Sequence, residues 1–310
     1  MTNKIEDIRQ LQEKPKWAEE YIPLDKSWII RMGVLDLLFG DENRKAYLKT
    51  FLGNQKDLGG DLLALKGVSE TWDTNEPVDV GESATLYRIL QFASRKFNLN
   101  KEFVTRGTLT ERVRNMTEGS EIVEMSLNEL LNLPKKTSQW ATASVLCGNT
   151  ERISNPPHHL QVSFEAVDYW NKQKEQGKIW EARPDETIRK QAEVFLELMR
   201  RKDVSFAPLQ AEDYCFAYTF GYMTREEGEM KWPELPGHES NRFIEMENML
   251  WKAKAGEMID SKDHRVVQAL VMWGLVNNKD VKILNRDAVN KTWPKFWDFI
   301  NYAKSLGESQ

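Results

Sequence analysis

The chain has 310 residues, of which 40% are hydrophobic, so it is long enough to bury one large core or two ordinary ones. Its formal net charge is −5, without a basic arm or the aromatic pattern of RNA-binding proteins, which argues against a nucleic-acid partner. Cys147 and Cys215 form no Cys-x-x-Cys pair and no Cys/His cluster, so neither a disulfide framework nor a metal site is expected.

Nothing in the sequence predicts a membrane segment or a targeting signal. Residues 1–16 are charged and lack the apolar centre of a signal peptide. The apolar run at 269–276 is far too short to cross a bilayer. We therefore expect a cytoplasmic protein, either a monomer or a weak homo-oligomer, with no membrane partner.

The first predicted helix begins near Ser27 and continues through an apolar face that ends at Leu38. Ser27 is a plausible N-cap, and Lys26 and Arg31 lie beside it. Two cations and several free backbone N–H groups around one point suit a phosphate or a carboxylate. The alternative is an ordinary capped helix with surface charges.

A short strand at 78–80 is predicted to pass through a tight turn at Gly81 into a helix that contains Arg88. Ser83 and Thr85 lie where that helix starts, so again a helix begins beside an arginine. From 41 to 71 the chain is polar with a Gly59-Gly60 break and indicates no site.

Two further segments carry polar groups before apolar helices. Arg112 follows Gly107, and Ser138 and Gln139 open a helix after Pro134. Residues 174–201 are strongly charged and are interpreted as a solvated helix or connector. Asp213 then stands directly before another apolar helix.

The late part of the chain has two clusters of acid, histidine and arginine. Glu239 and Arg242 form the first cluster, which on its own is compatible with a surface ion pair three residues apart. Asp263-His264-Arg265 precedes an apolar segment that ends near Val276, so this cluster should lie at a helix N-terminus, where anions bind. Lys291 lies in Val-Asn-Lys-Thr-Trp-Pro, ahead of a C-terminal helix.

In this order, the motifs resemble those of the 5-enolpyruvylshikimate-3-phosphate (EPSP) synthase family. That family has Asp-Lys-Ser with an arginine four positions after the serine, a Gly-Asn-Ser/Ala-Gly-Thr-x-x-Arg loop, and a Gly-x-x-x-x-x-Arg-Pro loop. It also has Ser-Ser-Gln, Lys-Glu-Ser/Thr-Asp-Arg, Asp-His-Arg and Val-x-Lys-Thr/Ser-Phe-Pro. Departures from these patterns include Glu82, Ala84, Val113, His238 and Asn241.

The resemblance implies transfer of the enolpyruvyl group of phosphoenolpyruvate to a hydroxyl of shikimate 3-phosphate or a related anion, without a cofactor. It implies acid/base or catalytic roles for Lys26, Asp213, Glu239 and His264. The substrate-binding positions would be Ser27, Arg31, Ser83, Thr85, Arg88, Arg112, Ser138, Gln139, Arg242, Arg265 and Lys291. Asp213 matches either the general base or an aspartate of an earlier repeat, because the chain is about one repeat shorter than the family between Gln139 and Glu239.

Periodicity alone supports helices alternating with short strands, hence an α/β or α+β fold. The resemblance implies two inside-out α/β barrels of repeated βαβαββ units, one with a repeat missing. Domain one would comprise residues 1–23 and 202–310, and domain two residues 24–201. We expect the helix starts to surround one cleft between the domains. Because fold does not fix chemistry, a repurposed protein that binds a phosphorylated small molecule stays an alternative.

Overall fold

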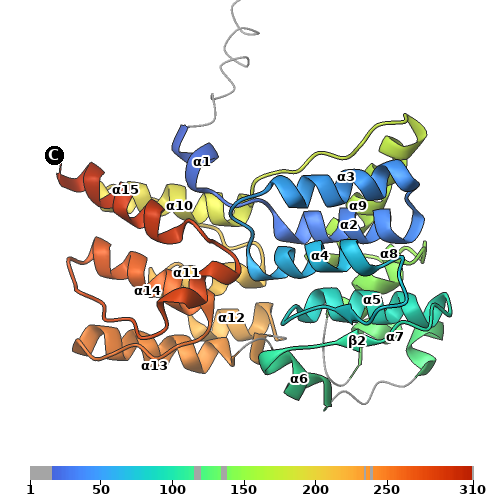
Figure 1. Ribbon diagram of the computed structural model, residues 1–310. Coiled ribbons are helices and arrows are strands. Elements are labelled where there is room, and N and C mark those ends of the chain that lie inside the picture. Colours follow the sequence, from blue (N-terminus) through green and yellow to red (C-terminus); the bar gives the residue numbers. More distant parts are fainter. Residues whose placement is uncertain (1–15, 115–119, 134–137, 234, 238–239, 309–310) are drawn as a thin grey trace, which may run out of the picture.

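The computed structural model describes residues 16–114, 120–133, 138–233, 235–237 and 240–308. The helices form two lobes that lie side by side (Figure 1). One cluster of buried apolar residues runs from Trp28 to Trp180 and forms the core of the N-lobe. Two further clusters, drawn from Ala18, Ile22 and residues 188–303, form the core of the C-lobe.

The N-lobe contains the elements between residues 26 and 175. They are α2 (Lys26–Phe39), α3 (Glu42–Asn54), α4 (Gly60–Thr71), β1 (Val78–Asp79), α5 (Ala84–Lys96), β2 (Phe103–Val104), α6 (Gly107–Arg114), the 3₁₀ turn η1 (Ser120–Glu124), α7 (Leu127–Leu131), α8 (Ser138–Leu146) and α9 (His158–Glu175).

The C-lobe combines the first described helix with the second half of the chain. Its elements are α1 (Lys16–Tyr21), α10 (Glu186–Met199), η2 (Ala211–Asp213), α11 (Tyr214–Thr219), α12 (Arg225–Lys231), η3 (Leu235–Gly237), α13 (Arg242–Ala255), α14 (His264–Val276), η4 (Arg286–Lys291) and α15 (Phe296–Glu308).

Side-chain capping explains where many of these helices begin. An acid, amide or hydroxyl before the first turn accepts a backbone N–H that has no partner within the helix. The caps that do so are Asp25, Asp41, Ser83, Ser126, Asp185, Thr224, Asn241 and Asp263. The predicted cap at Ser27 is wrong, because Asp25 accepts the N–H of Trp28 and Ser27 lies inside the first turn of α2. The predicted helix start at Asp263 is confirmed.

The described residues form a single small sheet. Strands β1 and β2 pair in parallel, with Val78 opposite Phe103 and Asp79 opposite Val104. The predicted strand near residue 78 is confirmed, and Ile283 makes one isolated bridge to Ile259. Helices with a small parallel sheet agree with the coarse class, α/β or α+β. The described strands are fewer than one βαβαββ unit requires, so the barrels stay a prediction.

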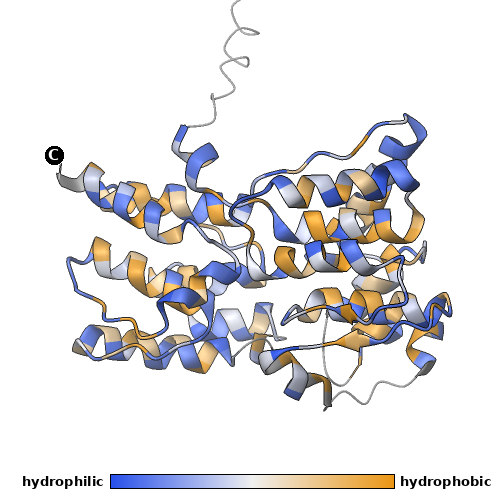
Figure 2. Cartoon of the chain, viewed as in Figure 1, coloured by the Kyte–Doolittle hydropathy of each residue, from blue (hydrophilic) through white to orange (hydrophobic). Residues whose placement is uncertain are grey.

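The apolar faces of the helices point into the two cores, as Figure 2 shows. Helix α10 illustrates the pattern, because Ile188, Ala192 and Phe195 are fully buried while its charged residues lie on the other side. The predicted solvated connector at 174–201 therefore includes an amphipathic core helix. Among the described helices, no stretch has both the length and the apolar character needed to cross a membrane.

Two chain segments cross between the lobes side by side, and we call residues 22–25 and 182–185 the crossover segments. Leu24 and Pro184 form an antiparallel bridge. Asp25 donates its N–H to Arg183 at 2.8 Å, and Asp185 donates to Pro23 at 2.8 Å. The Arg183 side chain bonds Asp25 at 3.0 Å and covers the Trp28 ring. Along the chain, buried residues belong to the N-lobe core up to Trp180 and to the C-lobe core from Ile188. The predicted domain boundary lies at residue 201 and stays a prediction.

Candidate functional site

Several helices begin at the boundary between the lobes, and direct contacts connect their first turns. Lys26 in α2 bonds Asp61 in α4 at 2.7 Å, and Asp61 also shares a hydrogen bond with Ser83, the cap of α5. Gln139, the second residue of α8, donates to Thr85 in α5 at 2.7 Å. In Figure 1, α2 and α4 run from this boundary into the N-lobe. Their dipoles add positive potential at the boundary, which favours an anion there.

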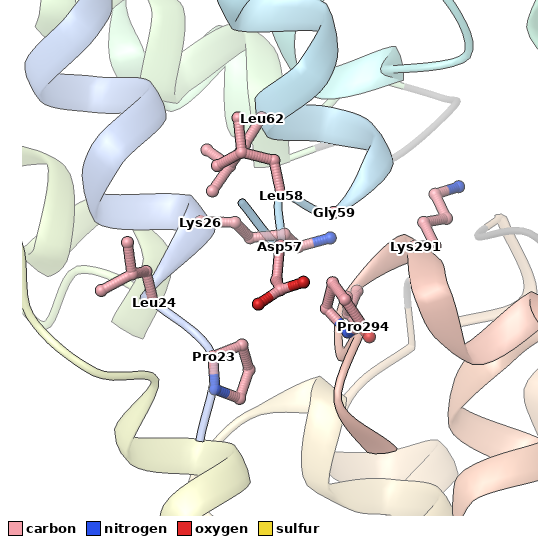
Figure 3. Close-up of a pocket in the computed structure, with 10 residues that line it drawn as sticks. Pro23, Leu24, Lys26, Asp57, Leu58, Gly59, Leu62, Lys291 and Pro294 are labelled. Atoms are coloured by element: carbon pink, nitrogen blue, oxygen red, sulfur yellow. The ribbon is translucent and has the colours of Figure 1, made fainter. Parts of the chain in front are cut away.

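Lys26 and Lys291 come from opposite lobes and line one small pocket (Figure 3). Its other lining includes Asp57, Gly59 and Pro294. A side chain at Gly59 would place its Cβ 2.6 Å from the carbonyl oxygen of Lys291, so glycine allows the close approach of the lobes. The cavity measures about 20 Å³, which is room for about one water molecule.

The carboxylate of Asp61, which bonds Lys26, is favoured in its charged form. Burial alone would raise the pKa of Asp61, but the charges of Lys26 and Lys291 and the hydrogen bond with Ser83 outweigh it and lower that pKa. Asp61 is thus a negative charge bonded to Lys26, one of the residues that line the pocket. An anion that entered would have to compete with it for Lys26.

Arg31 is a buried cation whose described hydrogen bonds all go to uncharged groups. Its Nε donates to the Ser163 hydroxyl at 3.1 Å, and its two Nη atoms donate to the His159 carbonyl and to Ser27. Burial lowers the pKa of Arg31 to about 10, while the charges of Asp25 and Glu212 act in the opposite direction. It therefore keeps its charge at neutral pH and raises the potential at the start of α2.

Arg88 and Gln139 form a second polar group in the N-lobe. The Gln139 side-chain oxygen accepts from Arg88 Nη1, while its nitrogen donates to the Thr85 hydroxyl. The amide therefore joins the first turn of α8 to that of α5. These predicted substrate contacts lie together, and Ser83 belongs to the same helix start with only 2% of its surface exposed.

On the C-lobe side, Arg242 forms a buried ion pair. Its Nε lies 2.8 Å from Asp263 Oδ2, and the Ser240 hydroxyl reaches the same oxygen at 3.2 Å. The other oxygen of Asp263 caps α14 by accepting the N–H of Arg265 at 2.9 Å. His264 is buried, with Nδ1 4.0 Å from Asp263. One aspartate thus ties the starts of α13 and α14 together.

Arg265 is a further buried arginine at a helix start. It is only 4% exposed, and its Nε and Nη1 atoms have no hydrogen-bond partner among the described residues. Buried donors are normally bonded, since leaving one unsatisfied costs about 1–3 kcal/mol. Asp185 lies close enough that the charges of Arg265 and Lys26 both act on its pKa. These donors are available for an anion at the boundary.

Asp213 occupies a buried capping position in the structure. Its Oδ1 accepts from Gln191 at 2.8 Å, and its Oδ2 accepts the N–H groups of Leu209 and Gln210 at 2.9 and 3.2 Å. Burial raises its pKa, although these hydrogen bonds act against the rise. The predicted role of Asp213 as general base stays a prediction, and these bonds give the carboxylate a structural role as well.

Some predicted site residues cannot be placed. Glu239 lies outside the described residues, and so do the side chains of Arg112 and Ser138, whose backbones belong to α6 and α8.

Sequence reasoning missed several groups at the boundary. Asp61 and Asp185 both stand in or before the first turn of a helix, after the Gly59-Gly60 break and after Pro184. Both positions are recognisable from the sequence as helix starts, but no local pattern indicates which cation each acid would contact. The Nε2 atom of His159 has no hydrogen-bond partner among the described residues. Burial lowers the pKa of His159 to about 4, and the nearby positive charge of Arg31 contributes to this lowering.

The comparison with protein families bears on the C-lobe side of this site. Residues 238–300 match the family model of EPSP synthase (3-phosphoshikimate 1-carboxyvinyltransferase). This segment is similar to part of that family. The predicted resemblance is confirmed there, over about a fifth of the chain. No curated protein and no solved structure matches the chain.

The matched segment contains the groups that define the C-lobe side of the boundary. It includes the ion pair of Arg242 and Asp263, the capped start of α14 with Arg265, and Lys291 in the pocket. An EPSP synthase-like, enolpyruvyl transferase-type protein is therefore what this segment supports. The N-lobe motifs lie outside the match, although Lys26 is brought against Lys291 by the fold.

Proposed function

We propose that the protein is an enolpyruvyl (carboxyvinyl) transferase. It would move the enolpyruvyl group of phosphoenolpyruvate to a hydroxyl of shikimate 3-phosphate, or of a related anionic acceptor, with release of phosphate. The observation that carries this proposal is the EPSP synthase family match, whose segment supplies Arg265, with its unbonded buried donors, at the lobe boundary.

The charges at the boundary suit substrates of this kind. Both substrates carry a phosphate and a carboxylate, and cations from both lobes line the boundary. Lys26 and Lys291 line the pocket, while Arg31 in α2 and Arg265 in α14 are buried. In a site largely closed to water, each contact is stronger than it would be on an exposed surface. Arginine adds forked contacts that fit phosphate and carboxylate oxygens.

The reaction needs proton transfers as well as anion binding. The acceptor oxygen bonds to the central carbon of phosphoenolpyruvate while the hydroxyl loses its proton and the methylene carbon gains one. The tetrahedral intermediate then loses phosphate and a proton of the new methyl group, which restores the double bond. Lys26, Asp213, Glu239 and His264 are the groups proposed for these transfers.

The small pocket implies that the lobes must separate before substrates enter. A cavity of about 20 Å³ is far smaller than phosphoenolpyruvate. The crossover segments join the lobes through few backbone hydrogen bonds, between Asp25 and Arg183 and between Asp185 and Pro23. Rotation about these segments would open the boundary without unfolding either core.

The second candidate function is binding of a phosphorylated small molecule without turnover. The observation that favours it is the set of three hydrogen bonds that hold the Asp213 carboxylate, since a general base needs a free lone pair directed at substrate. Such a protein would bind its ligand through the cations and would not need the acids for proton transfer.

Release of phosphate from phosphoenolpyruvate distinguishes the two functions. We expect release that depends on shikimate 3-phosphate or another phosphorylated hydroxy acid, with the enolpyruvyl product identified by mass spectrometry. Lys26→Ala should abolish most of the activity, and Lys49→Ala, an exposed lysine on α3, is the matched control. Binding of both substrates without release of phosphate would instead favour the binding protein.

A further inference from the structure

Helix α13 presents apolar side chains to solvent. It lies on the outer side of the C-lobe, beside α14 (Figure 1). Trp251 is 64% exposed, and it is the one exposed tryptophan of the eleven, all of which lie within the described residues. Ile244 is 45% exposed and lies seven residues earlier, which places it on the same side of the helix. Asn248 and Ala255 are exposed on that side as well.

Two more exposed apolar side chains lie just beyond the C-terminus of α13. Met258 is 49% exposed, and Leu284 is 59% exposed. Ile259 bridges Ile283 and accepts the N–H of Leu284 at 2.9 Å, so the two segments lie side by side. Ile259 is fully buried, and side chains alternate along extended backbone, so Met258 points outward. The α13 stripe comprises Ile244, Trp251, Met258 and Leu284.

Charged residues flank the α13 stripe, with acids near its start and bases near its end. Glu247 and Lys254 lie seven residues apart on one flank, and Glu245 and Lys252 lie seven residues apart on the other. Glu247 and Lys254 are exposed, whereas Glu245 and Lys252 are partly buried. Among the described residues, the Lys254 side chain has neither a hydrogen bond nor an ion pair. An apolar centre with a charged rim is the usual composition of a protein interface.

We propose that the α13 stripe binds a second copy of this chain, with the two α13 helices antiparallel about a twofold axis close to Trp251. The two Trp251 side chains then meet at the centre, and Ile244 of each protomer lies against Met258 of the partner subunit. Glu247 of each protomer lies beside Lys254 of the partner subunit, because the two residues stand at equal distances from the axis on the same flank.

The charge pattern is the reason for choosing a second copy as the occupant. A helix surface with acids at one end and bases at the other is complementary to itself when the second helix runs in the opposite direction. The Glu245 and Lys252 flank follows the same rule. The antiparallel arrangement also places the positive N-terminal end of each α13 beside the negative C-terminal end of the other.

Burial of Trp251 supplies the apolar part of the interaction. A tryptophan at the centre of a patch with a charged rim has the position of an interface hot spot. Because each protomer contributes little more than one helix, we expect a dissociation constant on the order of 10–100 µM. This inference does not depend on the proposed function, since no residue of the α13 stripe is proposed to bind or transform substrate.

The test is analytical ultracentrifugation of the full chain over a range of concentrations. We expect wild type to pass from one chain to two as its concentration rises through about 10–100 µM. Trp251→Glu should weaken dimerisation by about tenfold or more, because it places two like charges at the axis. Leu63→Glu is the matched control, since it places the same charge at an exposed apolar residue of α4, and it should dimerise as wild type does.

Exchange of the rim charges tests the antiparallel arrangement. Lys254→Glu and Glu247→Lys should each weaken dimerisation by about tenfold, because each places like charges across the axis. An equimolar mixture of the two variants should associate, since every glutamate of one variant then faces a lysine of the other. Glu247 also pairs with Arg225 at 2.8 Å, so Glu229→Lys, which removes the other partner of Arg225, controls for that loss and should dimerise.

Three results would overturn the proposal. The first is a wild-type chain that stays monomeric up to about 200 µM. The second is a dimer that Trp251→Glu leaves intact, or that Leu63→Glu disrupts to the same extent. The third is a mixture of Lys254→Glu and Glu247→Lys that associates no better than either variant alone, which would exclude antiparallel pairing even if Trp251→Glu were monomeric. Far-UV circular dichroism of each variant checks that it is folded.

Discussion

The buried arginines on the two sides of the lobe boundary differ in their hydrogen bonds. In the N-lobe, Arg31 donates to Ser27, His159 and Ser163, and Arg88 donates to Gln139. In the C-lobe, Arg265 is equally buried but keeps two nitrogen atoms without a described partner. The hydrogen bonds of the N-lobe cations orient their side chains, whereas two donors of Arg265 have no partner among the described residues.

This difference indicates which side supplies binding energy. A ligand that approaches Arg88 must replace a hydrogen bond that already exists, so the net gain is small. A ligand that reaches Arg265 satisfies donors that are already desolvated, and the cost of burying them has been met by folding. We therefore expect the C-lobe side to supply more of the binding energy for an anion than the N-lobe side.

The largest expected effect concerns Glu239, which lies in the family-matched segment. Glu239→Gln should lower the rate of phosphate release by roughly a hundredfold or more while leaving ligand affinity nearly unchanged, because binding needs the cations and chemistry also needs the acid. Steady-state kinetics and calorimetry on the same variant check this. Equal losses in rate and in affinity would assign Glu239 to binding.

Asp213→Asn requires a stability measurement beside the kinetic one. The substitution places an amide NH₂ among the donors of Gln191, Leu209 and Gln210, so we expect the free energy of unfolding to fall by about 1–3 kcal/mol. Urea denaturation gives that value. A loss of turnover beyond the loss of folded protein would support the general-base role.

The next effect in size concerns the affinity for sulfate, which should differ between variants on the two sides of the lobe boundary. Arg265→Ala should weaken sulfate binding by roughly thirtyfold, and Arg88→Ala by only a few-fold, because Arg88 already donates a hydrogen bond to Gln139 whereas two nitrogen atoms of Arg265 have no described partner. Arg200→Ala, on the surface at the end of α10, controls for the lost charge. Equal effects of Arg265→Ala and Arg88→Ala on affinity would remove the distinction between the lobes.

Protein stability should respond to Asp185 in a defined pH range. The folded pKa of about 6 lies above the unfolded value, so neutral Asp185 stabilises the fold at low pH and that contribution is lost as pH rises through about 6. Because the residue is partly exposed, Asp185→Asn should raise the free energy of unfolding by about 1–2 kcal/mol at neutral pH, and by nothing below about pH 4. Denaturation series across pH provide the check, and a constant difference would exclude titration as its cause.

The smallest expected effect concerns Glu82, beside the helix start that carries Thr85 and Arg88. In the family the corresponding loop has asparagine, and the added charge should repel the carboxylate of phosphoenolpyruvate. Glu82→Asn should therefore tighten phosphoenolpyruvate binding by a few-fold and leave the acceptor's affinity nearly unchanged. Weaker phosphoenolpyruvate binding in this variant would contradict the placement of that loop.

The sequence predicted the helix starts better than it predicted the overall fold. Local capping chemistry decides where α14 begins, so Asp263 could be recognised from its neighbours. The pairing of Asp61 with Lys26 joins residues 35 positions apart, and no local pattern specifies it. Among the described residues, the strands are β1 and β2 with two isolated bridges, and local propensity could not specify this pairing because it depends on distant partners.

The most direct test is a crystal structure of the protein with bound sulfate, or with phosphoenolpyruvate and shikimate 3-phosphate. We predict an anionic group within hydrogen-bonding distance of Arg265 Nε and Nη1, between the starts of α2 and α14, with the lobes moved about the crossover segments to admit it. Anions bound only at exposed lysines, with the surroundings of Arg265 unchanged, would contradict the account.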